Sequence, residues 1–200
     1  LYLKSLTDTS AQIDQANLAI TVTPNKDART LTISDNGIGM TAEELEKNLG
    51  TIAHSGSEEF KAANADKQGD AVDIIGRFGV GFYSAFMVAK EVSVVTRAFG
   101  SEECNRWTSD GIEGYTIEAV PADDPAYRQT AGSDVILTLK DNADEASYDE
   151  YLEEYTLKDL IRRYSNYVRY PVQMMVTKSR QKEKPEDAGD DYKPEWEDYQ

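Results

Sequence analysis

The feature that most constrains the fold is a strand that ends in a glycine-rich turn. Leu31, Ile33 and Asp35 alternate with polar residues, which is the period of a half-buried β-strand. Such a strand carries Asp35 to the inner side of a sheet, where a carboxylate is costly unless a hydrogen-bond donor approaches it. Gly37 and Gly39 follow, and glycine lets the backbone turn sharply and approach a flat ligand. The pattern predicts a buried acceptor beside an accessible stretch of backbone.

The residues after this turn add an apolar surface and a helix start. Met40 offers a deformable apolar side chain, and Thr41 with Glu44 fits a capping box, which predicts that a helix begins here. An acceptor at a strand end, a glycine turn and an apolar floor suit a planar amine such as a purine. A plain hairpin is the alternative, because Asn-Gly is also a hairpin signal. This stretch alone leaves both interpretations open.

A second glycine-rich stretch, residues 76–81, precedes the apolar segment 82–89. It predicts a glycine loop that leads into the start of a buried helix, where free backbone N–H groups and the helix dipole make an anion site. The spacing G-x-x-G-x-G lacks the Lys-Ser/Thr pair of a P-loop and does not complete the dinucleotide fingerprint. Close packing of a helix on a sheet is the alternative. The presence of both glycine stretches favours a ligand site.

Composition limits the class of protein. Hydrophobic residues make up 40% of the 200 residues, enough for the core of one large domain, or of one domain plus a tail. A net charge of −16 argues against a nucleic-acid or anionic-membrane binder. The single cysteine, Cys104, is compatible with a reducing cytosol. No apolar run approaches the roughly 18 residues of a membrane helix, and no signal peptide opens the chain. We therefore expect a cytoplasmic protein that binds neither nucleic acid nor membrane.

Alternating apolar and polar residues predict a mainly antiparallel sheet. We expect strands at residues 18–23, 30–35, 91–98, 105–109, 114–120, 134–140 and 172–176. The first strand is stopped by the turn residues 24–27, which begin with Pro24, and pairs with the second as a hairpin. The four strands between residues 91 and 140 are separated by glycine or Asp/Asn clusters, which predicts an antiparallel meander. Residues 121–130 form a loop.

Two further helices are expected. One begins at Thr41, carries leucines at an i, i+4 spacing and ends near Gly50; the other is capped by Thr156, runs to about residue 168 and is followed by Pro171. Helices over one face of a mostly antiparallel sheet make an α+β fold, a two-layer α/β sandwich.

Several motifs together resemble the nucleotide-binding domain of the 90-kDa heat-shock chaperones. They are DNGIGM at 35–40, NLGTIAHSG at 48–56, GRFGVGFYS at 76–84, LEEY at 152–155 and LKDLIRRYS at 157–165. The resemblance extends from about residue 6 to residue 175. It implies the Bergerat-type ATP-binding fold of the GHKL ATPase superfamily, which also includes DNA gyrase, sensor histidine kinases and mismatch-repair ATPases.

The resemblance also implies a function. The chain would be the ATP-binding domain of a molecular chaperone that uses ATP binding and hydrolysis to assist the folding of client proteins. ATP or ADP would be the ligand, with magnesium in the intact parent. That parent would be a homodimer that binds client proteins and co-chaperones. Two alternatives stay open: a histidine-kinase or gyrase-type domain on the same fold, and an interaction module whose glycine loops only pack.

The same resemblance assigns site residues. The adenine site would comprise Asp35, Gly39, Met40, Ser133 and Val135. The sugar and phosphate site would comprise Asn48, His54, Gly79, Val80, Gly81 and Phe82. Ser133 stands where the family often has threonine, and its hydroxyl can reach Asp35 directly or through water. Asn48 could instead cap its helix, and His54, where relatives often carry lysine, could be a solvated histidine at the edge of a lid.

One part of the family pattern has no counterpart at the start of the chain. In the family, a Glu-x-x-x-Asn helix supplies the general base and the magnesium ligand, and residues 1–16 do not match it. We expect that helix, and the strand before it, to precede Leu1. The chain would then hold no catalytic residue and no metal ligand, and would not hydrolyse ATP although its parent resembles an ATPase.

The expected domain division follows from composition. Residues 1–177 would be the nucleotide-binding domain. Residues 55–73 have thin apolar cover and would form its lid, with an ordinary surface excursion as the alternative. Residues 178–200 are highly charged and would form a solvated linker or tail.

Overall fold

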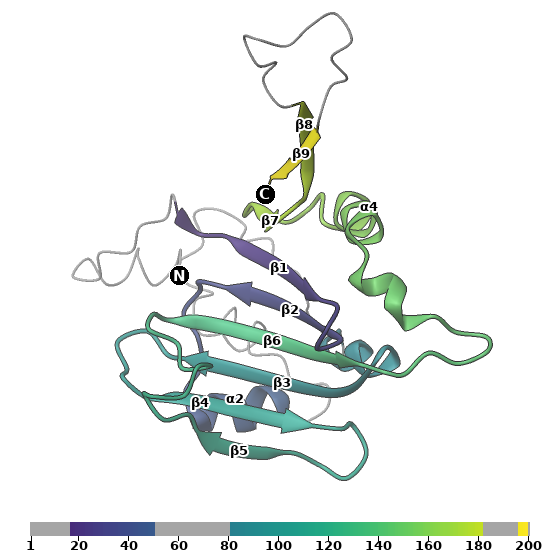
Figure 1. The fold of residues 1–200 in the computed structure, drawn as a ribbon. Coiled ribbons are helices and arrows are strands. Elements are labelled where there is room, and N and C mark those ends of the chain that lie inside the picture. The colour runs from purple at the N-terminus through teal and green to yellow at the C-terminus, as the bar shows by residue number, and fades with distance from the viewer. Residues whose placement is uncertain (1–16, 51–80, 182–195, 200) are drawn as a thin grey trace, which may run out of the picture.

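The computed structural model describes residues 17–50, 81–181 and 196–199. Within these residues seven strands form one sheet in the spatial order β5-β4-β3-β6-β2-β1-β7 (Figure 1). The strands are β1 (Ile20–Asn25), β2 (Thr30–Asp35), β3 (Ala89–Arg97), β4 (Cys104–Ser109), β5 (Thr116–Ala119), β6 (Gly132–Leu139) and β7 (Val172–Met174). Neighbouring strands are antiparallel except β1 and β7, which are parallel. The mostly antiparallel sheet is therefore confirmed.

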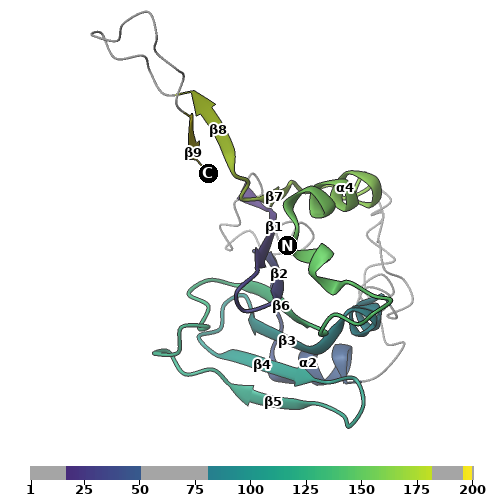
Figure 2. The ribbon, with the colours of Figure 1, turned by 45° about the vertical axis from the view of Figure 1, so that its right-hand side comes forward.

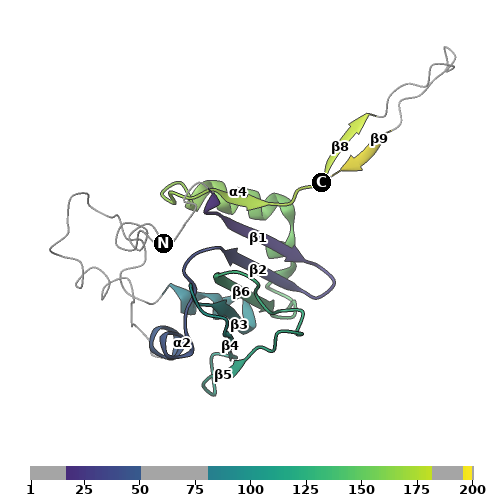
Figure 3. The same cartoon turned by 90° about the vertical axis from the view of Figure 1, so that its left-hand side faces the viewer.

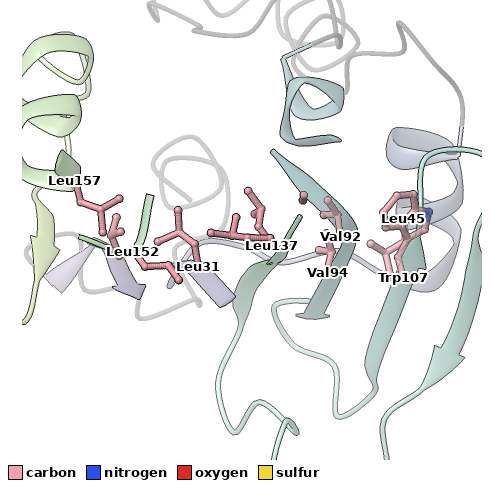
Figure 4. Close-up of a cluster of buried hydrophobic side chains, with 11 residues drawn as sticks. Leu31, Leu45, Val92, Val94, Trp107, Leu137, Leu152 and Leu157 are labelled. Atoms are coloured by element: carbon pink, nitrogen blue, oxygen red, sulfur yellow. The ribbon is translucent and has the colours of Figure 1, made fainter. Parts of the chain in front are cut away.

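Helices cover one face of this sheet. They are α2 (Ala42–Leu49), α4 (Glu154–Tyr164) and the 3-10 helices η3 (Phe82–Met87) and η4 (Tyr148–Leu152). In Figure 4, Leu45, Leu152 and Leu157 belong to the same row of buried side chains as Leu31 and Leu137 of the sheet. Burying a leucine typically stabilises a fold by about 1.5–3 kcal/mol. This helix-side core joins the two layers and confirms the α+β sandwich.

A smaller apolar cluster lies on the opposite face. Its buried members are Val95, Cys104 and Val120. Val95 follows Val94, which belongs to the helix-side core, and successive side chains of a strand point to opposite faces. Strand β3 is therefore covered on both faces, as its central place in the sheet requires.

The expected hairpin and capping box are confirmed. Strands β1 and β2 pair in antiparallel register. The Thr41 hydroxyl accepts a 3.2 Å hydrogen bond from the N–H of Glu44, and the Glu44 carboxylate accepts a 2.8 Å bond from the N–H of Thr41. Helix α2 then ends at Leu49, with Gly50 as its C-cap.

The expected meander is wrong in one connection. Strands β3, β4 and β5 are consecutive neighbours, but β6 pairs with β3 and β2 instead of β5. Leu137 and Leu139 of β6 are buried in the helix-side core, while Ile136 packs in the cluster on the other face. A strand with apolar side chains on both faces, as Leu137 and Ile136 are here, is best covered in the middle of a sheet.

The first strand ends at Asn25, two residues later than expected, and so includes Pro24. Pro24 lies opposite Leu31 of β2. Strand β7 pairs with β1 only at Ile20 to Val22. At Pro24, the edge of β1 that faces away from β2 is therefore not paired with β7. A proline, which has no N–H to donate, is tolerated at such an edge.

The apolar segment after the second glycine stretch does not start a buried helix. It forms the short 3-10 helix η3, none of whose residues is fully buried, and Met87 is 73% exposed. Strand β3 already begins at Ala89, which pairs with Leu139 of β6. The helix cannot continue because the following residues pair in the sheet.

Helix α4 begins earlier and ends earlier than expected. Its N-cap is Glu153 and not Thr156, and its last residue is Tyr164. No side-chain hydrogen bond caps the start, but Glu154 in the first turn places a negative charge near the positive end of the helix dipole. Leu157 and Ile161 lie one turn apart on this helix and pack against the core.

The charged C-terminal stretch contains strands that the sequence pattern did not predict. Strand β8 (Lys178–Gln181) pairs antiparallel with β9 (Trp196–Tyr199). This two-stranded ribbon projects away from the main sheet (Figures 2 and 3). Among the described residues, none of the helices is long and apolar enough to cross a membrane.

Candidate functional site

Asp35 ends β2 on the face that the helices cover, two residues after Ile33, which packs against the helix-side core. Its carboxylate oxygen Oδ1 accepts a 2.7 Å hydrogen bond from the N–H of Gly37. Burial raises the pKa of Asp35, while the Gly37 N–H and the positive charge of Arg128 act in the opposite direction. A carboxylate can accept about four hydrogen bonds, so Asp35 can also accept from a ligand.

Thr96 of β3 joins the glycine turn to the sheet. Its fully buried hydroxyl accepts a 2.9 Å hydrogen bond from the N–H of Met40 and donates a 3.0 Å bond to the carbonyl oxygen of Gly132. It also lies 2.9 Å from the hydroxyl of Ser133. Because the single Thr96 proton goes to Gly132, Ser133 is the donor in that contact. One side chain therefore links the turn, β3 and the start of β6.

Gly39 occupies a space that no side chain could fill. Its φ is +61°, and a Cβ atom there would lie 1.9 Å from the carbonyl oxygen of Arg97. The N–H of Phe99 donates a 2.7 Å hydrogen bond to the carbonyl oxygen of Ile38, which holds the turn against the end of β3. The turn then leads into α2 and not into a paired strand, so the hairpin interpretation of this turn is wrong.

Arg128 supports Asp35 from the main-chain side. Its guanidinium pairs with Asp134, and its Nη2 donates a 2.8 Å hydrogen bond to the carbonyl oxygen of Asp35. A hollow of about 440 Å³ lies beside it, lined in part by Thr21 and Ser34. These two residues alternate with members of the helix-side core, so the hollow lies on the other face of the sheet. Asp35 and Asn36 line it as well, so it reaches the strand end that carries the expected adenine contact.

Asn48 lies in the last turn of α2 and reaches back to the glycine turn. Its amide nitrogen is 3.9 Å from the sulfur of Met40, a weak hydrogen bond. The helix end is instead closed by the N–H of Gly50, which donates a 2.9 Å bond to the carbonyl oxygen of Glu46. Asn48 therefore lies beside Met40, which is expected to contact adenine. Its contact with the Met40 sulfur is not a cap of the helix C-terminus.

Strand β6 carries the remaining predicted adenine residues. Ser133 pairs with Asp35 in the sheet register, and Val135 pairs with Ile33. Ser133 and Val135 are two residues apart in β6 and so share a face of the sheet. Val135 packs against the helix-side core. The structure thus brings Asp35, Gly39, Met40, Asn48 and Ser133 together, with Val135 at the next inward position.

The predicted phosphate residues are only partly described. Gly81 precedes η3, and the ring of Phe82 packs edge-on against Trp107 at 5.5 Å between centroids. The Tyr83 hydroxyl donates a 2.9 Å hydrogen bond to the carbonyl oxygen of Leu49, which ties η3 to the end of α2. His54, Gly79 and Val80 lie outside the described residues, as does the lid expected at 55–73.

Thr96 and Arg128 were not anticipated from the sequence. Thr96 did carry a signal, because it is a polar residue at the inward position that follows Val92 and Val94. A buried hydroxyl at such a position needs a partner. Arg128 lies in an irregular loop, and no local pattern points to it.

Comparison with known proteins places this fold and site in a family. A family model described as histidine kinase-, DNA gyrase B- and HSP90-like ATPase matches residues 3–136, and a model described as Hsp90 protein matches residues 150–199. The chain belongs to the histidine kinase-, DNA gyrase B- and HSP90-like ATPase family.

Its particular relatives are bacterial chaperones. The protein named chaperone protein HtpG from Clostridium botulinum is 51% identical over 195 residues, which cover 98% of this chain and 30% of that protein. HtpG from Clostridium perfringens is 50% identical and HtpG from Natranaerobius thermophilus 48% identical, each over 192 residues covering 96% of this chain and 30% of the relative. The chain thus spans about a third of the length of these relatives.

These matches confirm the resemblance to the 90-kDa heat-shock chaperones and the fold class drawn from it. They support an ATP-binding domain of the chaperone type over the kinase-type, gyrase-type and pure interaction alternatives.

Proposed function

We propose that the domain binds ADP or ATP against the helix-covered face of the sheet, with the exocyclic amine of adenine donating to Asp35. The observation that carries this proposal is the network in which Gly37, Thr96 and Ser133 surround the half-buried end of β2. This network fixes the Asp35 carboxylate, the apolar side chain of Met40 and the tight glycine turn relative to one another. That arrangement suits a flat ligand with an amine on its edge.

Asp35 would also set the choice of base. A buried carboxylate that accepts from an amine rejects a ligand that lacks this donor, because the polar group is then left unpaired. Burial raises the pKa of Asp35, so a ligand amine would recover part of the free energy that burial costs the carboxylate. Guanine and hypoxanthine bases carry an oxygen at the corresponding position and would lose this contact.

The other predicted residues would complete the pocket. Met40 and Val135 would contact the faces and edge of adenine, and Gly39 would let the backbone approach it. Asn48 would reach the sugar or phosphates from α2. Backbone N–H groups of the glycine-rich loop, Gly79 to Phe82, would bind phosphate, and His54 would face it.

Metal-dependent hydrolysis is not assigned to these residues. In the part of the chain that the structure describes, no three His, Cys, Asp or Glu side chains gather into a possible metal site. Residues 1–16 also lack the Glu-x-x-x-Asn pattern that supplies the general base and the magnesium ligand in the family. We propose that a polypeptide of residues 1–200 binds nucleotide weakly and does not hydrolyse it.

For the longer protein, we propose an ATP-driven, magnesium-dependent chaperone that assists the folding of client proteins. The support is the similarity to proteins named chaperone protein HtpG. A homodimer, co-chaperones and a cytoplasmic location belong to the same proposal. So does the division into a nucleotide-binding domain at 1–177, with its lid at about 55–73, and a linker at 178–200.

Calorimetry with ADP tests the binding proposal. Asp35→Asn should weaken binding by on the order of 1–3 kcal/mol or more, because a buried charged acceptor is lost. Asp141→Asn is the matched control, since Asp141 is exposed and lies 3.6 Å from Lys90; it should bind ADP as the unmodified chain does. Equal ADP affinity for Asp35→Asn and the unmodified chain would show that the site is elsewhere.

A further inference from the structure

The guanidinium of Arg128 lies at the end of β2, on the face of the sheet opposite the helices. Its Nη1 pairs with Asp134, which follows Ser133 in β6 and so points away from the helix-covered face. Its Nη2 donates a 2.8 Å hydrogen bond to the main-chain carbonyl oxygen of Asp35. Only 13% of the Arg128 side chain is exposed. A mostly buried cation therefore joins the ends of the two strands that carry the expected adenine contacts.

Gly132 leaves the space beside this guanidinium. Its φ is +132°, and a Cβ atom there would lie 2.5 Å from Nη2 of Arg128 and 2.2 Å from the carbonyl oxygen of Asp35. The carbonyl oxygen of Gly132 accepts the 3.0 Å hydrogen bond from Thr96, whose hydroxyl also binds the N–H of Met40. Gly132 thus joins Arg128 on one face of the sheet to the glycine turn on the other.

A second arginine holds the loop that carries Arg128. The guanidinium of Arg97 in β3 donates hydrogen bonds of 3.1 and 2.8 Å to the carbonyl oxygens of Arg128 and Gln129. It also lies 5.7 Å from the centre of the Tyr127 ring, which is within cation–π distance. The Tyr127 hydroxyl donates a 2.7 Å bond to the carbonyl oxygen of Glu102. These contacts tie the loop to the sheet and so fix where Arg128 lies.

Arg128 also acts on the charge of Asp35. Burial is the largest influence on the pKa of Asp35 and raises it; the positive charge of Arg128 lowers this pKa, and the negative charge of Asp134 raises it. Within the described residues, these are the charged side chains that act on the Asp35 carboxyl group. The neighbouring glycine turn, β3 and α2 contribute uncharged side chains, namely Met40, Thr96 and Asn48. Because a ligand amine needs an ionised acceptor, Arg128 favours the form of Asp35 that can bind it.

We propose that Arg128 is a positioning residue for the nucleotide site, which fixes the main chain of Asp35 and stabilises its ionised carboxylate from the opposite face of the sheet. The guanidinium acts through Asp35 and not by contact with the nucleotide. The inference rests on the proposed function, in which Asp35 accepts a hydrogen bond from adenine. It adds that base recognition depends on a side chain beyond the sheet.

Arg29 provides a matched control. Its guanidinium pairs with Asp149, and its Nη2 donates a 2.7 Å hydrogen bond to the carbonyl oxygen of Lys140. These are the same two kinds of contact that Arg128 makes. Arg29 directly precedes β2, so it lies at the end of that strand opposite Asp35, about 20 Å away. Arg29→Gln should therefore remove a comparable charge, ion pair and carbonyl contact without an effect on the nucleotide site.

Carboxyl-carbon NMR of the ligand-free 200-residue chain tests the electrostatic part without nucleotide. The Asp35 signal is assigned by its absence in Asp35→Asn. Arg128→Gln should raise the pKa of Asp35, and Asp134→Asn should lower it, because these substitutions remove opposite charges. Arg128→Lys keeps the charge and should have a pKa close to that of the unmodified chain, and Arg29→Gln should not change it. A merely structural role would move the pKa in one direction, since Arg128→Gln and Asp134→Asn break the same ion pair.

Calorimetry with ADP tests the positioning. Arg128→Gln should weaken ADP binding by about fivefold to tenfold, because the Asp35 main chain loses a hydrogen bond from a charged donor. Arg128→Lys should recover only part of the affinity, since an ammonium group lacks the fork that contacts two partners at once. Arg29→Gln should change ADP affinity by less than about twofold, because distant sites act independently. Circular dichroism melting verifies that each variant is folded. If Arg128→Gln does not fold, Arg128→Lys and Asp134→Asn decide the question by the same criteria.

Several results would overturn the proposal. They are a shift of the Asp35 pKa in the same direction in Arg128→Gln and Asp134→Asn, no shift in either, or equal losses of ADP affinity in Arg128→Gln and Arg29→Gln. If Asp35→Asn weakens ADP binding and Arg128→Gln does not, this inference is wrong and the proposed function stands. If Asp35→Asn binds ADP as the unmodified chain does, the proposed function is wrong, and the role of Arg128 in the site is wrong with it.

Discussion

The backbone N–H of Met40 donates a 2.9 Å hydrogen bond to the hydroxyl of Thr96, 56 residues further along the chain. The same hydroxyl donates to Gly132 and lies within hydrogen-bond distance of Ser133. The glycine turn after Asp35 is therefore fixed by the central strands of the sheet. Thr96 acts through these residues, which makes it a positioning residue for the proposed site.

Replacing Thr96 tests this role. Thr96→Val keeps the shape but removes the hydroxyl, which leaves the Met40 N–H and the Gly132 carbonyl without this partner. The free energy of unfolding should fall by about 1–3 kcal/mol, and ADP affinity should fall with it. Urea unfolding and calorimetry measure the two effects. Thr96→Ser retains the hydroxyl and should preserve most of the affinity; if Thr96→Ser and Thr96→Val lose affinity equally, the hydrogen bond is not what matters.

A pair of glycine substitutions separates close packing from backbone strain. Gly39→Ala would place a Cβ 1.9 Å from the Arg97 carbonyl oxygen, whereas Gly100→Ala, also at positive φ, has nothing within 4 Å. Gly100→Ala should cost only the strain of about 1–2 kcal/mol. Gly39→Ala should cost more and should displace the turn from Thr96. Thermal melting of both variants measures this, and equal losses would contradict the close approach of the turn to β3.

The pKa of Asp35 predicts a pH dependence of binding. Burial raises this pKa in the ligand-free protein, and a donating amine favours the ionised form. ADP affinity should therefore be full above the ligand-free pKa and fall as the pH is lowered through it. Calorimetry as a function of pH measures the slope. Any pH dependence of ADP affinity that remains in Asp35→Asn arises from other groups. If the pH profile of this variant equals that of the unmodified chain, Asp35 is not the source of the pH dependence.

The same shift has the opposite consequence for the ligand-free fold. A carboxyl group whose pKa is higher in the folded state than in the unfolded state binds more protons when folded. Its contribution to the free energy of unfolding is present at low pH and is lost as the pH rises through the folded pKa. Asp35→Asn should therefore leave ligand-free stability at neutral pH unchanged or raised, although ADP binding is weakened. A large loss of stability at neutral pH would mean that Asp35 is structural.

Hydrolysis provides a further prediction. A polypeptide of residues 1–200 should release no phosphate from saturating ATP above the level of Asp35→Asn, since residues 1–16 do not match the Glu-x-x-x-Asn pattern of the family. Glu44 and Asn48 have that spacing, but the Glu44 carboxylate caps α2. Loss of a general base typically lowers a rate by about 10²–10⁴-fold. Turnover comparable to that of an intact family member, absent from Asp35→Asn, would place the base within these residues.

Local patterns predicted the parts of the fold that depend on neighbouring residues. The capping box at Thr41 and the β1–β2 hairpin both arise from contacts within about 15 residues of sequence, and both were predicted. The fold class followed from the resemblance. Asp35 was predicted as an acceptor because strand alternation places it on the same face as Ile33.

The misses share a physical cause, which is pairing over long sequence distances. Strand β6 lies between β3 and β2, where Leu137 and Leu139 on one face and Ile136 on the other are covered, and a meander assumption cannot anticipate that. The apolar run at 82–87 became a short 3-10 helix because Ala89 is already paired in the sheet. Thr96 became visible as a site residue only when β3 was placed beside the glycine turn. Strands β8 and β9 were missed because a highly charged composition indicated a linker.

The central claim is that the Asp35 carboxylate accepts a hydrogen bond from the adenine amine. The most direct test compares the affinities of the chain for ADP and for inosine diphosphate. The two ligands differ at the base, where the amine is replaced by an oxygen. The unmodified chain should bind ADP about tenfold or more tightly than inosine diphosphate. In Asp35→Asn the asparagine amide can donate to that oxygen, so the preference should disappear or reverse. An ADP preference of the same size in both proteins would contradict the account, because the amine would then be recognised by another group.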